Sequence, residues 1–198
     1  QYQRDFEFVI GQLEKGTCEG AVLALELKRT IHAHWGNVFN EITRGNPSAY
    51  GFMVSDENCT ICGSTPLAFM SMENDEICLD TDAGTRPVTG NQAEDDAAEA
   101  DLKASPKDQR EHDIVVRAEE AALKAVAASG SVRVTVDKEV RRFSHIMHMY
   151  SVLEAKLRSD LTAGEALQTL YPPAAVTGLP KHDAALIGQS LETGLSGP

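Results

Sequence analysis

The sequence predicts an α+β protein. Several short apolar runs of strand type, separated by turn residues, lie between Tyr50 and Leu79. A long helical pattern covers Pro106 to Ala128, and an alternating run over Val132–Val136 follows it. Because strands and helices come in separate blocks, we expect helices beside a sheet rather than a regular β-α-β alternation. The 198 residues are enough to bury a hydrophobic core.

The N-terminal third begins with a helical pattern. Gly16 is a plausible end of this helix. The apolar residues that share one helix face are Phe6, Val9, Ile10 and Leu13. The apolar run Ala21–Leu25 predicts a buried strand. A second helix is expected around Val38–Ile42, ended by Gly45 and the turn residues Asn46-Pro47.

Strands are expected next, and helices after them. Four strand-like runs follow one another: Tyr50–Val54, Cys59–Cys62, Ala68–Met72 and Glu76–Leu79. Residues 91–104 are acidic and rich in alanine, which predicts a solvated helix or a linker. The helix over Pro106–Ala128 has an apolar set for its inner face: Ile114, Val115, Ala118, Ala122, Leu123 and Val126. After Val132–Val136 we expect a short strand over His145–Ser151 and a helix over Ala163–Leu170.

Charge and composition exclude some partners. The formal net charge is −12, which argues against a nucleic-acid or anionic-membrane surface. No run approaches the roughly 18 apolar residues of a membrane span. The opening residues do not resemble a signal peptide. The four cysteines then read as reduced thiols, and a cytoplasmic location is expected.

Cys59 and Cys62 form a C-x-x-C motif, a pattern found in metal sites and in redox sites. A structural zinc site needs four ligands, and neither Cys18 nor Cys78 has a partner at a matching spacing. A redox pair would open a helix, whereas this motif lies in a strand-like run. Small apolar strand residues are the preferred interpretation.

Several residues carry weaker chemical signals. Asp108 and Glu111 share a helix face and could form half of a Mg²⁺ site, although without further context a solvated helix face is the preferred interpretation. His145 and His148 would point to opposite faces of a strand. Two small-residue turns, Ala83–Pro87 and Val176–Lys181, offer backbone N–H groups and a cation to an anionic ligand.

Taken in order, these segments resemble the chorismate-utilising enzymes over nearly the whole chain, most closely anthranilate synthase component I. The matching segments are Asn46–Phe52, Gly63–Pro66, Ala83–Gly90, Lys107–His112, Gly130–Val134, Arg142–His148, Tyr171–Lys181 and Leu191-Glu192. The resemblance implies two packed β-sheets with outer helices and an active site between the sheets.

The resemblance also implies roles for individual residues. Glu111 matches the family's magnesium glutamate, and Asp108 matches an acidic neighbour. His148 matches the active-site histidine, and Thr85 with Gly84 matches the loop that meets the substrate. A late turn on the substrate side supplies Thr177, Gly178 and Lys181.

The implied reaction converts chorismate and ammonia into anthranilate and pyruvate, a lyase step of tryptophan biosynthesis. The implied cofactor is Mg²⁺, which would orient the substrate and offset its charge. The implied partner is a glutamine amidotransferase subunit that supplies the ammonia. Aminodeoxychorismate, isochorismate and salicylate synthases are the alternatives within the family.

Some family positions differ in this chain. Leu67 stands where the family usually has the glutamate that protonates the departing hydroxyl. Other departures are Gly20 at the position that marks the nucleophile, Ala24-Leu25, Arg117–Ala122 and Ala175. The family continues past the end of this chain, so residues 1–198 are expected to be a C-terminally incomplete chorismate-binding domain. A catalytically inactive chorismate-binding paralogue therefore remains open beside the enzyme.

Overall fold

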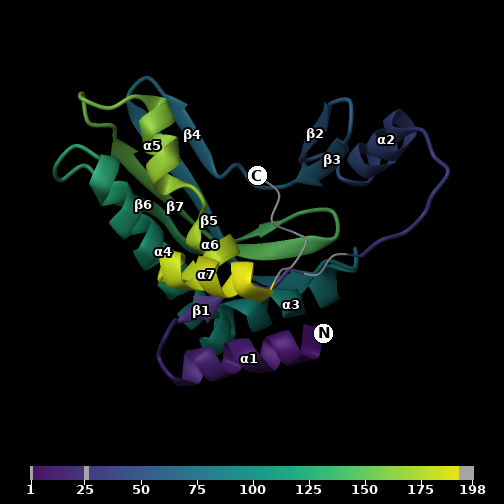
Figure 1. Cartoon of the computed structure of the whole chain (residues 1–198), viewed down its shortest axis with the longest axis horizontal. Helices are drawn as coiled ribbons and strands as arrows, with labels where there is room; N and C mark the ends of the chain where they lie inside the picture. The colour runs from purple at the N-terminus through teal and green to yellow at the C-terminus, as the bar shows by residue number, and fades with distance from the viewer. Residues whose placement is uncertain (1, 25–26, 192–198) are drawn as a thin grey trace. The chain divides into compact units, whose positions relative to one another are not determined.

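The computed structural model describes residues 2–24 and 27–191 (Figure 1). Their strands form one four-stranded sheet and two two-stranded sheets, and the strand pairs within these sheets are antiparallel. The α+β class is thereby confirmed. The chain divides into two compact units: a central unit, Ile31–Thr169, and a terminal unit made of Gln1–Thr30 and Leu170–Pro198.

The four-stranded sheet of the central unit carries most of the candidate site. Its strand order is β4 (Met70–Glu73), β5 (Glu76–Pro87), β7 (Ile146–Lys156) and β6 (Arg133–Arg142). A tight turn at Asn74, with φ of 54°, joins β4 to β5. The long partners β5 and β7 therefore lie at the centre, where both of their edges are paired.

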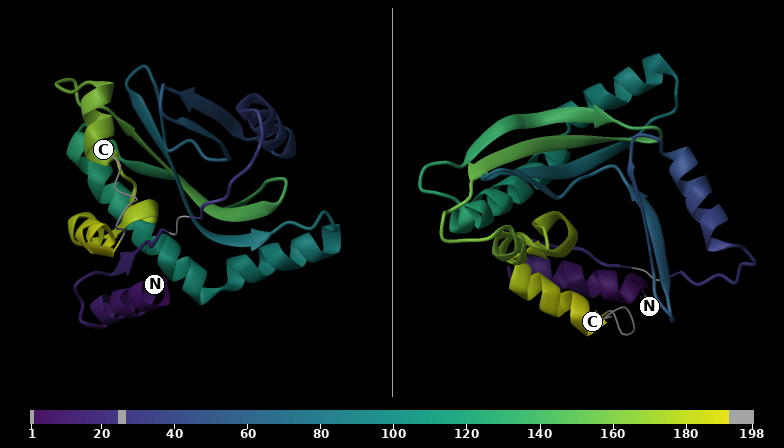
Figure 2. Two further views of the ribbon diagram at one scale, coloured as in Figure 1. Left: turned by 45° about the vertical axis from the view of Figure 1, so that its right-hand side comes forward. Right: turned by 90° about the horizontal axis from the view of Figure 1, so that it is seen from above.

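Two helices cover one face of this sheet. Helix α3 (Gln92–Ala104) and helix α4 (Pro106–Val126) both pack against β5 and β7 (Figures 1 and 2). Asn91 caps α3, and the Ser105 hydroxyl accepts the Asp108 N–H at the start of α4. Strand residues alternate strictly in β7, so every second side chain enters the core. The buried side chains include Ile77, Leu79, Leu102, Leu123, Met147, Met149 and Leu153.

A separate hairpin belongs to the same unit. Strand β2 (Tyr50–Ser55) pairs with β3 (Thr60–Thr65), and helix α2 (Trp35–Gly45) packs against both. The Asp56 carboxylate accepts the N–H groups of Asn58 and Cys59 at 2.8 Å, which forms the turn. Cys59 and Cys62 are free thiols in this hairpin. The preferred interpretation of the C-x-x-C motif as strand residues is consistent with this placement.

The terminal unit joins the two ends of the described chain. It contains α1 (Tyr2–Glu14), β1 (Gly20–Ala21), α6 (Ala174–Thr177), β8 (Gly178–Leu179) and α7 (Lys181–Leu191). Strand β1 pairs with β8, and Ala21 lies opposite Gly178. Gly178 has φ of +109°, and a Cβ there would lie 2.1 Å from the Gly20 carbonyl oxygen. Only glycine fits this close approach.

Most predicted elements are present, and several have other bounds: β5 continues to Pro87 and β7 to Lys156, past the predicted ends at Leu79 and Ser151. Helix α5 (Ala163–Leu170) has the predicted bounds, and α4 ends two residues before the prediction. The strand predicted over Ala21–Leu25 is only Gly20–Ala21, because its partner β8 offers two residues; Leu25 lies outside the described residues. Strand β6 continues to Arg142, well past the predicted end at Val136. Within the described ranges, no helix is long and apolar enough to cross a membrane.

Candidate active site

Strands β5 and β7 bring Thr85 and His148 together. The two residues are direct partners in the antiparallel ladder, and Thr85 Oγ1 lies 2.9 Å from His148 Nδ1. Burial lowers the pKa of His148, and a hydrogen bond to the Gly84 backbone opposes this effect. The imidazole is therefore neutral at pH 7 and can exchange a hydrogen bond with a ligand. Two sequence-predicted residues thus form one polar pair.

The turn before Thr85 depends on a glycine. The register of β5 against β7 shifts between Asp82 and Thr85, and Gly84 within this shift has φ of +93°. A Cβ at Gly84 would lie 3.1 Å from Leu102 Cδ1 and 3.3 Å from Asp108 Cβ. The strand backbone therefore approaches helix α4 more closely than another residue would allow.

Arg86 connects this turn to helices α3 and α4 through hydrogen bonds. Its guanidinium donates to Asp101 at 2.7 Å, to Asp108 at 2.8 Å and to the Thr85 carbonyl at 2.8 Å. The Asp108 side chain is 10% exposed, and hydrogen bonds from Ser105 and Arg86 lower its pKa. Sequence reasoning placed the Arg86 cation near a bound anion, whereas here the cation is occupied by two carboxylates of its own chain.

Glu111 differs from Asp108 in its surroundings. It lies on α4 with a side chain 53% exposed, and its carboxylate accepts the Lys107 ammonium group at 2.9 Å. An exposed lysine is easily displaced by a divalent cation, and Mg²⁺ uses one or two protein carboxylates with waters or substrate oxygens. Glu111 thus fits a magnesium ligand, whereas Asp108 would first have to leave Arg86. Among the described residues no group of three or more acidic, histidine or cysteine side chains forms a metal cage.

His112 is a buried residue that holds the site's backbone. Its Nδ1 donates to the Ala83 carbonyl at 3.1 Å, and its Nε2 accepts the Ser151 hydroxyl at 2.8 Å. This tautomer is assigned from the partners, since a carbonyl can only accept. Burial lowers the pKa of His112, which stays neutral. Sequence analysis quoted His112 only as the neighbour of Glu111.

The late turn lies in the terminal unit. The Thr177 hydroxyl donates to the Pro173 carbonyl at 3.1 Å, and Gly178 follows in β8. Lys181 is the first residue of α7, and its ammonium group donates to the Leu170 carbonyl at 3.0 Å. Lys181 therefore reaches the last residue of α5. These three predicted residues are neighbours within their own unit.

Sequence analysis missed a charged group on β5. Asp80 and Asp82 lie two residues apart and point to the same face of the sheet as Thr85 and His148. Arg141 of β6 binds Asp80 through two hydrogen bonds, at 3.0 and 3.3 Å, and its guanidinium carbon lies 4.0 Å above the centre of the Tyr150 ring. The signal available in the sequence was a pair of acidic residues inside a strand pattern.

Asp82 is the unusual member of this group. Both of its carboxylate oxygens are shielded from solvent, and neither has a hydrogen-bond partner among the residues that the structure describes. Burial, with repulsion from Asp80, raises the pKa of Asp82 to about 7, although Arg141 works against this. Near neutral pH a large share of Asp82 therefore carries a proton.

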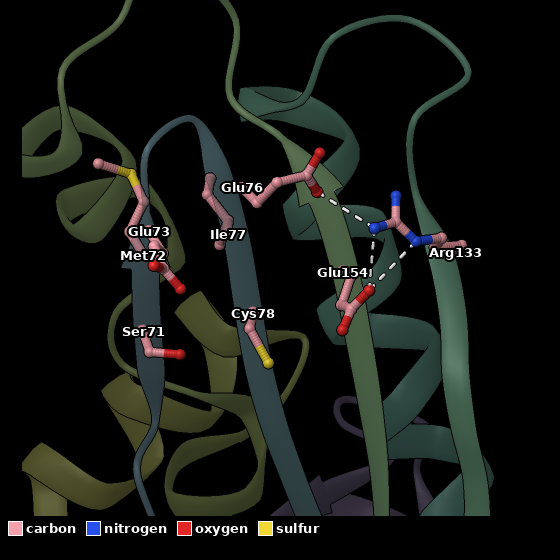
Figure 3. Close-up of a pocket in the computed structure, with 8 residues that line it drawn as sticks. All are labelled: Ser71, Met72, Glu73, Glu76, Ile77, Cys78, Arg133 and Glu154. Carbon is pink, nitrogen blue, oxygen red and sulfur yellow. Dashed lines mark hydrogen bonds and ion pairs between the residues drawn. The ribbon is translucent and has the colours of Figure 1, made fainter.

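A separate hollow of about 630 Å³ opens at the β4–β5 turn (Figure 3). In it Arg133 bridges Glu76 and Glu154, at 3.2 and 2.9 Å. Cys78 also lines it, and burial raises the pKa of this thiol. Seven residues of extended strand, about 23 Å, separate Cys78 from Thr85. The hollow is therefore distinct from the Thr85–His148 pair.

Comparison with known proteins identifies the family. The family model described as chorismate binding enzyme matches residues 1–194. This chain belongs to the chorismate-binding enzymes. Anthranilate synthase component 1 of Geobacillus stearothermophilus is 32% identical over 192 residues, which cover 97% of this chain and 38% of that protein. A homologue of the same name from Haloarcula marismortui is 29% identical over 165 residues, 83% of this chain and 33% of its own length.

Solved structures of chorismate-utilising enzymes share the fold. Anthranilate synthase component I from Streptococcus pneumoniae superposes with a TM-score of 0.87 and 26% identity, covering 97% of this chain and 42% of that one. The menaquinone-specific isochorismate synthase of Escherichia coli gives 0.70 with 24% identity, covering 77% of this chain and 35% of that one, which is a likeness of fold alone. This chain thus spans well under half the length of these relatives.

Proposed function

We propose that this chain contributes to an anthranilate synthase, which converts chorismate and ammonia into anthranilate and pyruvate. The observation that carries the proposal is the Thr85–His148 pair, because family-matched residues 63 positions apart meet at 2.9 Å in a chain related to anthranilate synthases along most of its length. A neutral imidazole beside a hydroxyl suits a substrate that carries hydroxyl and carboxylate groups.

Each remaining residue has a role in this proposal. Glu111 would hold Mg²⁺, which when bound orients the substrate carboxylate and offsets its negative charge. Arg86 and His112 position the Ala83–Thr85 backbone through their bonds to Thr85 and Ala83. The family resemblance assigns substrate binding to Thr177, Gly178 and Lys181 of the terminal unit. A glutamine amidotransferase subunit would supply the ammonia.

A second candidate is a paralogue that binds chorismate without converting it. The observation that favours it is Leu67, whose side chain has no titratable proton where the resemblance calls for an acid. Gly20 and Ala175 add further departures from the family pattern. The two candidates differ in turnover, and they share chorismate binding.

The test uses the full-length protein as its source produces it. Anthranilate is followed by fluorescence with chorismate, ammonium and Mg²⁺, and chorismate binding is measured separately by calorimetry. Mg²⁺-dependent anthranilate formation supports the proposal. Another product assigns the chain to an alternative branch of the family, and binding without conversion supports the inactive paralogue.

A substitution at Leu67 separates two causes of inactivity. In an inactive parent, Leu67→Glu restores turnover if a proton donor alone is missing, while Leu67→Gln, of the same length without an acid, does not. If neither variant is active, the loss extends beyond this position and the enzyme proposal fails.

A further inference from the structure

The sheet face that carries Thr85 and His148 also carries an acid. In the β5–β7 ladder Asp82 is opposite Tyr150, and Thr85 is opposite His148. Tyr150 and His148 are two residues apart on one strand, so they point to the same side and lie about 6–7 Å apart. A ligand that contacts the Thr85–His148 pair therefore lies within the span of one small ring from Asp82.

The surroundings of Asp82 keep its proton in place. The charged and titratable groups near Asp82 on this face are Asp80 from β5, His148 and Tyr150 from β7, and Arg141 and Glu139 from β6, while Cys78, Glu154 and Arg133 lie on the same face further toward the β4–β5 turn. The guanidinium of Arg141 is held by both oxygens of Asp80 and lies over the Tyr150 ring. Asp82 is thus left with burial and a carboxylate neighbour, both of which favour its neutral form.

Strand β4 offers Asp82 no partner on the other side of β5. The strand begins at Met70, which pairs with Leu79, and residues 66–69 lie outside it. Neither Asp82 oxygen has a hydrogen-bond partner within the described ranges, so no hydrogen bond there stabilises an ionised carboxylate.

We propose that Asp82 is the acid that protonates the departing ring hydroxyl of chorismate. The inference rests on the proposed function. Ammonia forms a bond from nitrogen to the ring, the ring double bonds shift, and the carbon–oxygen bond breaks with its electron pair on oxygen. The Asp82 proton converts the departing hydroxide to water, and the proton released from the new ammonium nitrogen restores the carboxyl group.

The experiment compares Asp82 variants of the full-length protein with ammonia as the nitrogen source. Asp82→Asn keeps the shape and removes the acid, so kcat is expected to fall by about 10²–10⁴-fold. The Kd for chorismate, measured by calorimetry, should stay within threefold. Asp82→Glu should retain part of the activity, and Asp75→Asn, in the exposed β4–β5 turn, should leave kcat unchanged.

A pH profile distinguishes an acid from a structural residue. In the parent protein kcat should fall as pH rises through the Asp82 pKa of about 7, and the residual rate of Asp82→Asn should lose this limb. A carboxyl carbon signal of Asp82 titrating in the same range by NMR would support the assignment without relying on turnover.

Several outcomes would overturn the inference. An Asp82→Asn variant with kcat within threefold of the parent removes Asp82 from the chemistry and leaves the proposed function standing. An inactive parent that binds chorismate and that Leu67→Glu activates shows that Asp82 does not act as the acid, and it supports the inactive paralogue in place of the proposed function. A parent that does not bind chorismate ends both the inference and the proposed function.

Discussion

The Arg86 guanidinium and the Asp108 carboxylate meet at 2.8 Å between strand β5 and helix α4. The guanidinium is 25% exposed and the carboxylate 10% exposed, so the pair is largely removed from water. Since Arg86 also bonds Asp101 on α3, one side chain connects the Ala83–Pro87 turn to both covering helices. The geometry therefore gives Asp108 a structural partner within the chain.

Asp108→Asn should destabilise the protein by about 1–3 kcal/mol at pH 7, because a partly buried guanidinium loses a charged acceptor. The folded-state pKa of Asp108 is lowered, so its contribution is present above the unfolded pKa of about 3.9 and is lost as pH falls through the folded value. Urea unfolding at pH 7 and pH 3 measures this, and an equal difference at both pH values would contradict it.

Glu111→Gln should raise the Mg²⁺ concentration required for activity or for chorismate binding by tenfold or more, since a neutral amide is a weaker ligand for a hard cation. Glu120→Gln is the matched control. It removes a similar exposed ion pair, Glu120–Lys124, from a later part of the same helix. Equal Mg²⁺ requirements in the two variants would remove Glu111 from the metal site.

Asp82→Asn should stabilise the fold above neutral pH. The folded-state pKa is raised to about 7, so between about pH 4 and 7 the unfolded-state carboxyl ionises while the folded one keeps its proton, and the parent loses stability as pH rises through this range. The variant should be about 1–3 kcal/mol more stable at pH 8, and the gap should close near pH 4. Thermal unfolding across this range tests it; a gap independent of pH would refute the environment described for Asp82.

His112→Gln should cost stability at pH 8, because it disturbs the bonds to Ala83 and Ser151. The folded-state pKa of His112 is lowered below 6.5, so the parent loses stability as pH falls below that value and the unfolded chain takes up a proton. The difference between parent and variant should shrink by about 1–2 kcal/mol between pH 8 and pH 5. His145→Gln, at an exposed position, should show no such change.

Periodicity predicted the helices better than the strands. Helix α4 begins at the predicted Pro106, and Leu123 and Val126 face the core as expected. The same helix buries His112 and Glu119, which no apolar pattern reveals. In β6 the regular alternation ends near Val136, where the register against β7 shifts and Lys138 takes a φ of 53°. A period of two residues detects only the regular part of a strand, so the irregular part of β6 was not predicted.

The family resemblance supplied Thr85 and His148, and the structure places them together. It could not supply Asp82 or Arg141, because their environment depends on residues about sixty positions apart that meet only across the sheet. An acidic residue within a strand pattern usually indicates a solvated face. Asp82 is distinguished by its burial and by the lack of a hydrogen-bond partner among the described residues, which only the folded chain shows.

The register shift between Asp82 and Thr85 has a consequence for every residue after it. Up to Thr81, the odd-numbered side chains of β5 enter the core, and the unshifted ladder would pair Thr85 with the buried Met147. One additional residue reverses that parity, so the hydroxyl of Thr85 emerges beside His148 while Arg86 turns toward the helices. In β5 the relation between residue number and sheet face is therefore opposite before and after the shift. Removing a single residue at Ala83-Gly84 would restore a regular ladder in which Thr85 still lies opposite His148, so the later side chains would keep their faces while the strand lost its bulge.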